Sequence, residues 1–128
     1  MSVWVALLAV AGGGAIGAVL RWGVTLATAS LPTGRWAGFP VGTLLVNVVG
    51  TFLLAWFVAS SSSREWASPA LRLFITTGVL GALTTFSTFG LDAHGLLQQG
   101  RSLQALLYVG ATLTLAGGAV LLGWVVGR

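Results

Sequence analysis

Four long apolar stretches, separated by short polar segments, dominate the hydropathy pattern of this chain. They cover about residues 3–22, 40–59, 70–97 and 103–126. Because roughly 20 consecutive apolar residues cross the hydrocarbon core of a bilayer as a helix, each stretch is long enough for one membrane span. The pattern predicts an all-α membrane protein that forms a single four-span domain over residues 1–128.

The third stretch is too long for one straight span, and its centre is polar. Gly78 and Gly81 precede the run Thr-Thr-Phe-Ser-Thr-Phe at residues 84–89. A membrane helix interrupted there must satisfy its backbone groups within protein or in a wet cavity, and broken spans commonly mark ion sites. We predict that the third helix is broken in the middle of the membrane and that the break lies at an ion site.

The second and fourth stretches each carry a line of polar residues at helical spacing. Thr43, Asn47 and Thr51 recur every four residues, and Tyr108 and Thr112 repeat that spacing. An asparagine in hydrocarbon fits two roles, a hydrogen bond between helices or the lining of a pore. Tyr108 likewise fits either ring packing with its hydroxyl bonded to a neighbour or a place in a polar pathway.

The first stretch has a face of small residues that leads to a positive charge. Gly13 and Gly17 have the GxxxG spacing that lets another helix approach closely. Arg21 follows Gly14 and Gly17 on one helical face and fits either a side chain that reaches the lipid headgroups or a structural or pore-mouth cation.

Composition disfavours an enzyme. The 128 residues are 56% hydrophobic and 6% charged, with a mean hydropathy of +0.97 and no cysteine. Asp92 and His94 are two residues apart, so they share no helical face. One aspartate and one histidine are also too few for a metal cluster or a catalytic site. For Asp92 three roles are open: helix capping, pairing with an arginine across an interface, or a place beside a vestibule. His94 is expected at the membrane interface.

The polar residues that remain suit a passive path for a small anion. Hydroxyl and amide groups donate hydrogen bonds, and the edges of aromatic rings carry partial positive charge. These groups offset the dehydration of an anion without the full charge that would hold it too tightly.

The net charge of +4 comes from six arginines and two acidic residues. The arginines are scattered singly, which is untypical of nucleic-acid binding. In a four-span topology, one side of the membrane receives Arg64, Arg72 and Arg128, and the other receives Arg21, Arg35 and Arg101. Because arginine asymmetry sets orientation, this balance predicts insertion both ways round, which permits an antiparallel homodimer. The alternative is an orientation fixed by partners or by one dominant residue.

Three blocks of the sequence resemble the signature motifs of the Fluc (CrcB) fluoride channel family. They are GGGAIGAVLRW at residues 12–22, GTLLVNVVG at 42–50 and GVLGALTTFSTF at 78–89. The last block is highly specific, and the resemblance covers the whole chain in length, order and span count. Two positions depart from the family pattern: Gly90 stands where serine is common, and Asp92 where glutamate is common.

The resemblance implies a dual-topology antiparallel homodimer in a prokaryotic plasma or inner membrane, with two fluoride pores and a structural Na⁺ on its axis. It implies that backbone carbonyls of Gly81 and Thr84 from both subunits hold the Na⁺. The ring edges of Phe86 and Phe89 would face fluoride, and Arg21 would lie near the pore vestibule. The other pore-lining residues that it implies are Asn47, Ser87, Thr88, Tyr108 and Thr112.

The expected function is therefore passive efflux of fluoride, which lowers its cytoplasmic concentration and toxicity. A first alternative is a small proton-coupled exporter of the multidrug-transporter type, which also forms four-span antiparallel dimers. Those exporters carry an essential acid in the first span, and residues 3–22 contain none. A second alternative is a helix-packing subunit without a transport role.

Overall fold

The computed structural model describes residues 1–62 and 66–128, which are helical apart from short connections. Within these residues, four helical segments are long and apolar enough to cross a membrane. Three are continuous, namely α1 (Val3–Thr28), α2 (Val41–Ser62) and α6 (Ser102–Gly127). The third along the chain is divided into α3 (Pro69–Leu73), the π-helical η2 (Phe74–Leu80), α4 (Gly81–Leu83) and α5 (Phe86–Gln98). The predicted all-α organisation with a broken third span is confirmed.

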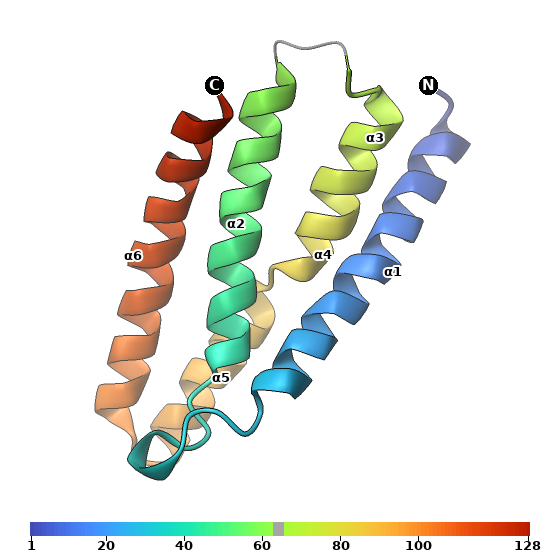
Figure 1. Cartoon of the computed structure of the whole chain (residues 1–128). Helices are drawn as coiled ribbons and strands as arrows, with labels where there is room; N and C mark the ends of the chain where they lie inside the picture. Colours follow the sequence, from blue (N-terminus) through green and yellow to red (C-terminus); the bar gives the residue numbers. More distant parts are fainter. Residues whose placement is uncertain (63–65) are drawn as a thin grey trace.

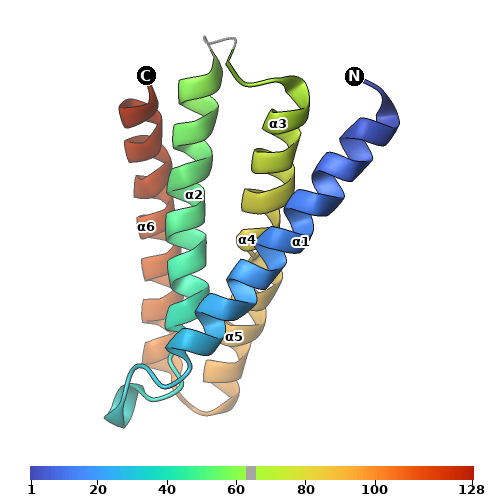
Figure 2. The ribbon, with the colours of Figure 1, turned by 45° about the vertical axis from the view of Figure 1, so that its right-hand side comes forward.

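The spans form two pairs. Helices α2 and α6 lie side by side, while α1 crosses the third span at an angle and packs against α3, η2 and α4 (Figures 1 and 2). A short 3₁₀ turn, η1 (Gly34–Trp36), lies in the connection between α1 and α2. Both termini lie at the same end of the molecule, and the turn between α5 and α6 lies at the other end (Figure 1).

Glycines set how closely the paired helices approach. Gly13 and Gly17 are buried, and a Cβ on either would collide with a carbonyl oxygen of η2, that of Phe74 or that of Val79. This confirms the close approach that the GxxxG spacing predicts. Gly123 and Gly127 do the same between α6 and α2, since a Cβ on Gly127 would lie 2.6 Å from the Trp56 carbonyl oxygen.

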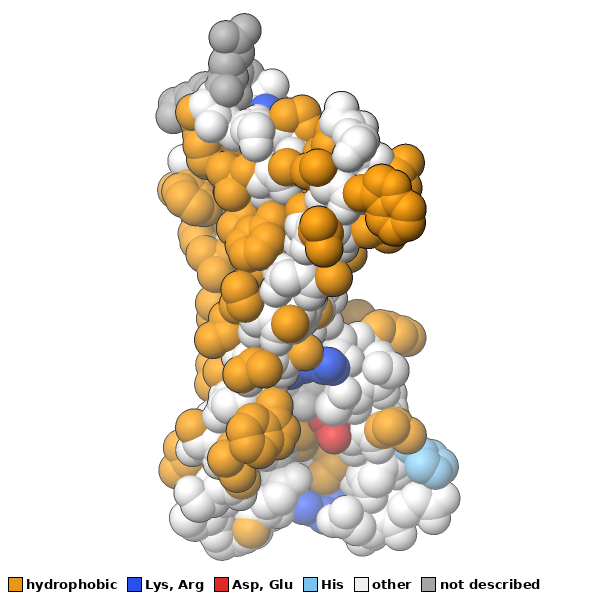
Figure 3. Space-filling view, turned by 90° about the vertical axis from the view of Figure 1, so that its right-hand side faces the viewer, with side chains coloured by type: hydrophobic (Ala, Val, Ile, Leu, Met, Phe, Trp, Pro, Cys, Tyr) orange, Lys and Arg blue, Asp and Glu red, His pale blue; other side chains and the backbone are white. Residues whose placement is uncertain are grey.

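The outer surface is that of a protein in lipid. Large hydrophobic side chains are exposed on all four spans, among them Leu8, Trp22, Leu91 and Leu121. Figure 3 shows one face on which hydrophobic side chains predominate and charged ones are few. Exposure of such a surface to water would be unfavourable, whereas contact with the hydrocarbon core of a bilayer is not.

The arginines lie near both ends of the spans. Arg35 and Arg101 belong to the connections at the end where α6 begins. Arg72 and Arg128 lie at the opposite end, where Arg72 donates to the backbone carbonyls of Ser61 and Ala67. Arg64, which completes the charge balance expected from the sequence, lies outside the described residues.

Candidate ion pathway

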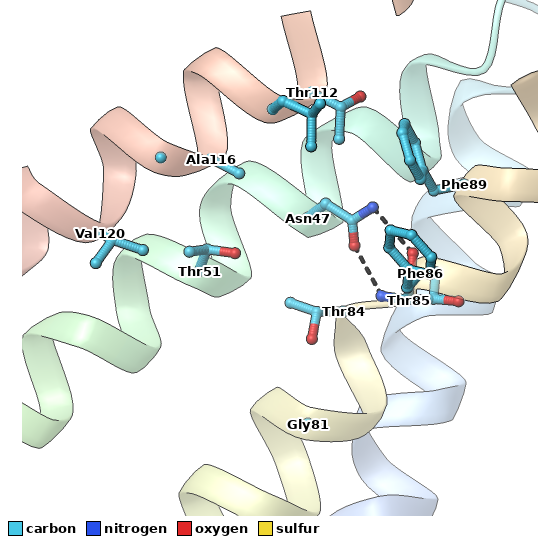
Figure 4. Close-up of a pocket in the computed structure, with 12 residues that line it drawn as sticks. Asn47, Thr51, Gly81, Thr84, Thr85, Phe86, Phe89, Thr112, Ala116 and Val120 are labelled. Atoms are coloured by element: carbon cyan, nitrogen blue, oxygen red, sulfur yellow. Dashed lines mark hydrogen bonds between the residues drawn. The ribbon is translucent and has the colours of Figure 1, made fainter. Parts of the chain in front are cut away.

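The third span breaks at Thr84 and Thr85, whose backbones are extended, with ψ of 151° and 119°. The side-chain amide of Asn47, from α2, bridges the break (Figure 4). Its Oδ1 accepts from the Thr85 N–H at 2.7 Å, and its Nδ2 donates to the Thr85 carbonyl at 3.1 Å. Because an unpaired peptide group costs several kcal/mol in hydrocarbon, this bridge makes the break possible.

Helix α5 restarts directly after the break because Thr85 caps it. The Thr85 Oγ1 accepts from the Thr88 N–H at 3.2 Å, which satisfies one of the free donors of the first turn. The same hydroxyl donates to Thr88 Oγ1 at 3.1 Å. An asparagine on one span and a threonine cap on the other thus fix where the helix ends and where it resumes.

Two backbone carbonyls lose their helical hydrogen bonds at the break, because the N–H groups that would donate to them donate to side chains instead. In a continuous helix the Thr85 N–H would donate to the Gly81 carbonyl, and the Thr88 N–H to the Thr84 carbonyl. Here both N–H groups donate to side-chain oxygens instead, those of Asn47 and Thr85. Unwound carbonyls of this kind are the oxygen donors that Na⁺ takes in broken spans. The residues at the break therefore suit a sodium ion chemically.

A cavity of about 550 Å³ opens beside the break, between α2, α4, the start of α5 and α6. Phe86 and Phe89 stand at one end of it, with ring centroids 5.5 Å apart and ring planes inclined at 47° (Figure 4). Phe86 is 80% exposed in the single chain, whereas Phe89 is buried. The other residues of the wall are Asn47, Thr51, Gly81, Thr84, Thr85, Thr112, Leu113, Ala116, Gly117 and Val120.

Thr112 brings an unused hydroxyl to this cavity from α6. The residue is buried, and its Oγ1 has no hydrogen-bond partner among the described residues. The hydroxyls of Thr84 and Thr85, which also lie on the wall, donate hydrogen bonds to protein oxygens. A buried hydroxyl without a partner carries a desolvation cost, which a ligand in the cavity would remove.

Tyr108 lies outside the wall of this cavity. Its side chain is fully buried, with the ring against Phe39 and Phe89. Its hydroxyl donates to Asp92 Oδ2 at 3.3 Å, and the Thr43 hydroxyl donates to the same oxygen at 2.7 Å. Tyr108 therefore both packs its ring and bonds its hydroxyl, and Asp92 is held between α2 and α6 by two neutral donors.

Arg21 lies at a different cavity, of about 200 Å³, between α1, α2 and α5. Thr88 also lines it, together with Thr43 and Thr85. Ser87 is exposed and contacts the Thr85 hydroxyl at 3.2 Å. Of the residues expected along the pathway, Arg21, Thr88, Ser87 and Tyr108 thus lie outside the wall of the large cavity.

The break sends Thr84 and Thr88 to different cavities, although they are four residues apart, because extended residues separate them. Thr84 lines the large cavity, and Thr88 lines the cavity of Arg21. Phe86 and Phe89, which both follow the break, share a face.

Thr85 is the residue that sequence reasoning missed. In the sequence it is only one of several hydroxyl residues in a row, yet in the structure it is both the partner of Asn47 and the cap of α5. The available signal was a threonine three residues before another polar residue at a helix restart, which is the spacing of an N-cap and its N3 position.

The fold and the site together define a class: a small helical membrane protein with a broken span beside a polar cavity, the arrangement found where ions are bound or conducted. Residues 8–124 match the family model described as "CrcB-like protein, Camphor Resistance (CrcB)". The chain therefore belongs to the CrcB family, as the resemblance of its three blocks indicated.

Relatives from several bacteria are similar over nearly the whole chain. A protein of Aeromonas salmonicida named "Fluoride-specific ion channel FluC" is 46% identical, over 96% of this chain and 94% of its own length. One of the same name from Rhizobium meliloti is 42% identical, over 91% of each chain. "Fluoride-specific ion channel FluC 2" of Geobacillus kaustophilus is 40% identical, over 91% of this chain and 86% of its own.

Proposed function

We propose that this protein is a fluoride-selective ion channel in a cell membrane and that it lets fluoride leave the cytoplasm passively. The observation that carries the proposal is the cavity beside the break, which presents two phenylalanine rings, an amide and an unpartnered buried hydroxyl. The fluoride-specific relatives, which match this chain over nine-tenths of its length, support the choice of ion.

The chemistry of the cavity wall suits a small anion. The Thr112 hydroxyl can donate to an ion, because it has no protein partner within the described residues. Asn47 uses one amide N–H for Thr85, and an amide nitrogen has two. The edges of Phe86 and Phe89 add partial positive charge. Fluoride, a strong hydrogen-bond acceptor, gains most from such donors when it sheds water.

The described residues of the wall are all uncharged, which favours conduction over tight binding. Arg21 is proposed to act outside the wall, where its charge draws anions toward the mouth of the pathway. Ser87, Thr88 and Tyr108 are proposed to extend the polar path beyond the large cavity.

A second copy of this chain is proposed to complete the pathway. Phe86 is 80% exposed at mid-span, so one side of the cavity lacks a wall in the single chain. The arginines, three on each side of the four-span topology, favour insertion both ways round, so the two copies would be antiparallel. Each copy is proposed to be one four-span domain over residues 1–128.

The same assembly would complete a sodium site. The two carbonyls that lose their helical donor, those of Gly81 and Thr84, are too few to replace the hydration shell of an ion, whereas two copies supply four. Bound Na⁺ would supply a fixed positive charge at the centre of the dimer, and the four carbonyls would hold the two breaks together.

The proton-coupled exporter is the weaker candidate. Helix α1 contains no acidic residue, and Asp92, the acidic residue among those described, lies on α5 with both Thr43 and Tyr108 bonded to it. It lies off the wall of the large cavity. Such an exporter needs an ionisable group in contact with its substrate path.

Efflux from liposomes tests the proposed function. Protein is reconstituted into vesicles loaded with both fluoride and chloride, and the release of each ion is followed with a selective electrode. We expect rapid release of fluoride and retention of chloride. Release of both ions at one rate, or of neither, would contradict the proposal.

A comparison of Phe86→Ile with Phe52→Ile tests whether fluoride efflux depends on the cavity. Phe86 lines the cavity, whereas Phe52 lies half-buried on α2 away from it. We expect loss of fluoride efflux for the first variant alone. A helix-packing subunit without a transport role would show no efflux that either change could remove.

A further inference from the structure

A second cavity, of about 420 Å³, lies at the end of the molecule where α6 begins. It is formed by η1 and by the first two turns of α6, elements far apart in the sequence. Its wall combines two arginines with an aromatic ring and two leucines. The lining residues are Arg35, Trp36, Gly100, Arg101, Ser102, Leu103, Gln104 and Leu107.

The two sides of this cavity are bonded to each other. Gln104 Nε2 donates to the Arg35 carbonyl at 2.7 Å, and Arg101 NH2 donates to the same carbonyl at 3.4 Å. Arg101 also donates to the side-chain oxygens of Gln104 and Gln99, to the latter at 3.3 Å. These hydrogen bonds fix η1 against the start of α6, so the shape of the cavity is defined by specific contacts.

Within residues 1–62 and 66–128, neither positive charge of the cavity has a carboxylate partner. The acceptors of Arg101 are all neutral amide or carbonyl oxygens. The Arg35 guanidinium lies 5.8 Å from the centroid of the Trp36 ring, a cation–π contact that leaves its N–H groups available. Asp92, the acidic residue among those described, already accepts from Thr43 and Tyr108. No carboxylate of the described part of the chain therefore neutralises the two positive charges of the cavity.

The position of the cavity identifies the kind of anion. It lies at the ends of the spans, where Trp36 has the amphipathic ring typical of the membrane interface. Leu103 and Leu107, one turn apart on α6, are 68% and 45% exposed and lead from the cavity toward the middle of the span. A phosphate with acyl chains matches both the charged end and this apolar track, whereas a free anion would match the charge alone.

We propose that this cavity binds the headgroup of one anionic phospholipid. The two guanidinium groups take the phosphate, since arginine matches phosphate oxygens with paired N–H donors. An acyl chain lies along Leu103 and Leu107. A zwitterionic lipid is disfavoured because the wall offers no carboxylate to its ammonium group. Each copy of the chain carries one such site, independent of the ion pathway.

Native mass spectrometry of the full chain tests this proposal. Protein in detergent is mixed with equal amounts of phosphatidylglycerol and phosphatidylcholine, and the retained lipid is counted. We expect a clear preference for phosphatidylglycerol, which falls about fivefold in Arg35→Gln and again in the double variant with Arg101→Gln. Arg35→Gln is the primary variant, because its side chain braces nothing else in the described structure.

Arg128→Gln is the matched control. Arg128 also stacks on a tryptophan, with its guanidinium carbon 5.6 Å from the Trp124 ring centroid, but at the other end of α6 and outside this cavity. We expect it to keep the lipid preference. An equal loss in Arg128→Gln, no loss in Arg35→Gln, or no preference in the unchanged protein would each overturn the proposal. So would full displacement of the lipid by millimolar inorganic phosphate, which would make the site one for a free anion.

Discussion

Asn47 and Thr112 face the same cavity but use their polar groups in opposite ways. The amide of Asn47 forms two hydrogen bonds with the backbone of Thr85, so it is part of the scaffold. The hydroxyl of Thr112 forms none with the described residues, so it is available to an ion. Substitution of Asn47 should therefore lower the stability of the protein, whereas substitution of Thr112 should lower ion conduction.

Thr112→Val tests the free hydroxyl. Valine keeps the shape of threonine and removes the donor, so we expect fluoride efflux to fall by at least about tenfold, the loss of one hydrogen bond to a charged group. Stability should stay unchanged or rise, because no protein hydrogen bond is lost. Efflux and thermal unfolding are measured on the same preparation.

Thr114→Val is the control for that change. Thr114 is exposed, two residues along α6, and its hydroxyl donates to the Gly110 carbonyl of its own helix at 2.6 Å. It lies off the cavity wall, so efflux should persist. Equal efflux from Thr112→Val and the unchanged protein would show that the hydroxyl does not serve the ion.

Asn47→Ala tests the scaffold. The change leaves the N–H and the carbonyl of Thr85 without their side-chain partner in a buried site. We expect a loss of about 2 to 4 kcal/mol in unfolding free energy, since each unsatisfied buried group costs about 1 to 3 kcal/mol. Urea unfolding in detergent measures it. A loss no greater than that of Thr51→Ala, which removes a polar side chain one turn away on the same helix, would contradict the bridging role.

At the scale of elements, the close contact of α1 with η2 positions the break. Gly17→Ala would drive a Cβ into the Val79 carbonyl, so we expect a loss of about 1 to 3 kcal/mol in stability. Gly14→Ala, in the same helix, meets nothing within 4 Å and should be neutral or stabilising by up to about 1 kcal/mol. Thermal unfolding of both variants separates the contact from helix propensity, and equal shifts would argue against it.

The sequence predicted the break but not its construction. Two glycines and a run of hydroxyl residues in an overlong span were enough to expect an interruption near residues 78–89. The π-helical geometry of η2 was not predictable, because nothing local marks it and the segment packs tightly against Gly13 and Gly17. The local sequence pattern indicates that a helix ends in this region, whereas tertiary contacts determine the residue at which it ends.

The same limit applies to the site residues. The helical spacing on α2 predicted that Thr43, Asn47 and Thr51 share one face, but not that Thr43 bonds to Asp92 and Asn47 to Thr85. The sequence allows Asp92 three roles, and the structure gives it another, as the acceptor of hydrogen bonds from two hydroxyls. Which donor meets which acceptor depends on helix rotation and offset, and these are properties of the packed molecule.

At the scale of the whole molecule, the proposed antiparallel assembly predicts a dependence on charge balance. One added arginine should tip a balanced chain toward one orientation. Gln98→Arg, at the end of α5, and Ser62→Arg, at the end of α2, lie at opposite ends and should bias it in opposite directions. Each variant expressed alone should therefore lose most fluoride efflux, whereas the two expressed together should regain it.

The measurement for that prediction is efflux from vesicles made with one variant or both. A control is the conservative Gln98→Asn, which keeps the charge balance and should conduct. Full efflux from each arginine variant alone would show that opposite orientations are not needed.

The most direct test of the pathway uses the absence of cysteine from this chain. A single cysteine is introduced at Ala116, on the cavity wall, or at Gln98, exposed at the end of α5, and fluoride efflux is measured before and after a small polar thiol reagent. If fluoride passes the broken span, modification should stop efflux through Ala116→Cys and leave Gln98→Cys unaffected. Undiminished efflux after complete modification of Ala116→Cys would place the ion's route elsewhere.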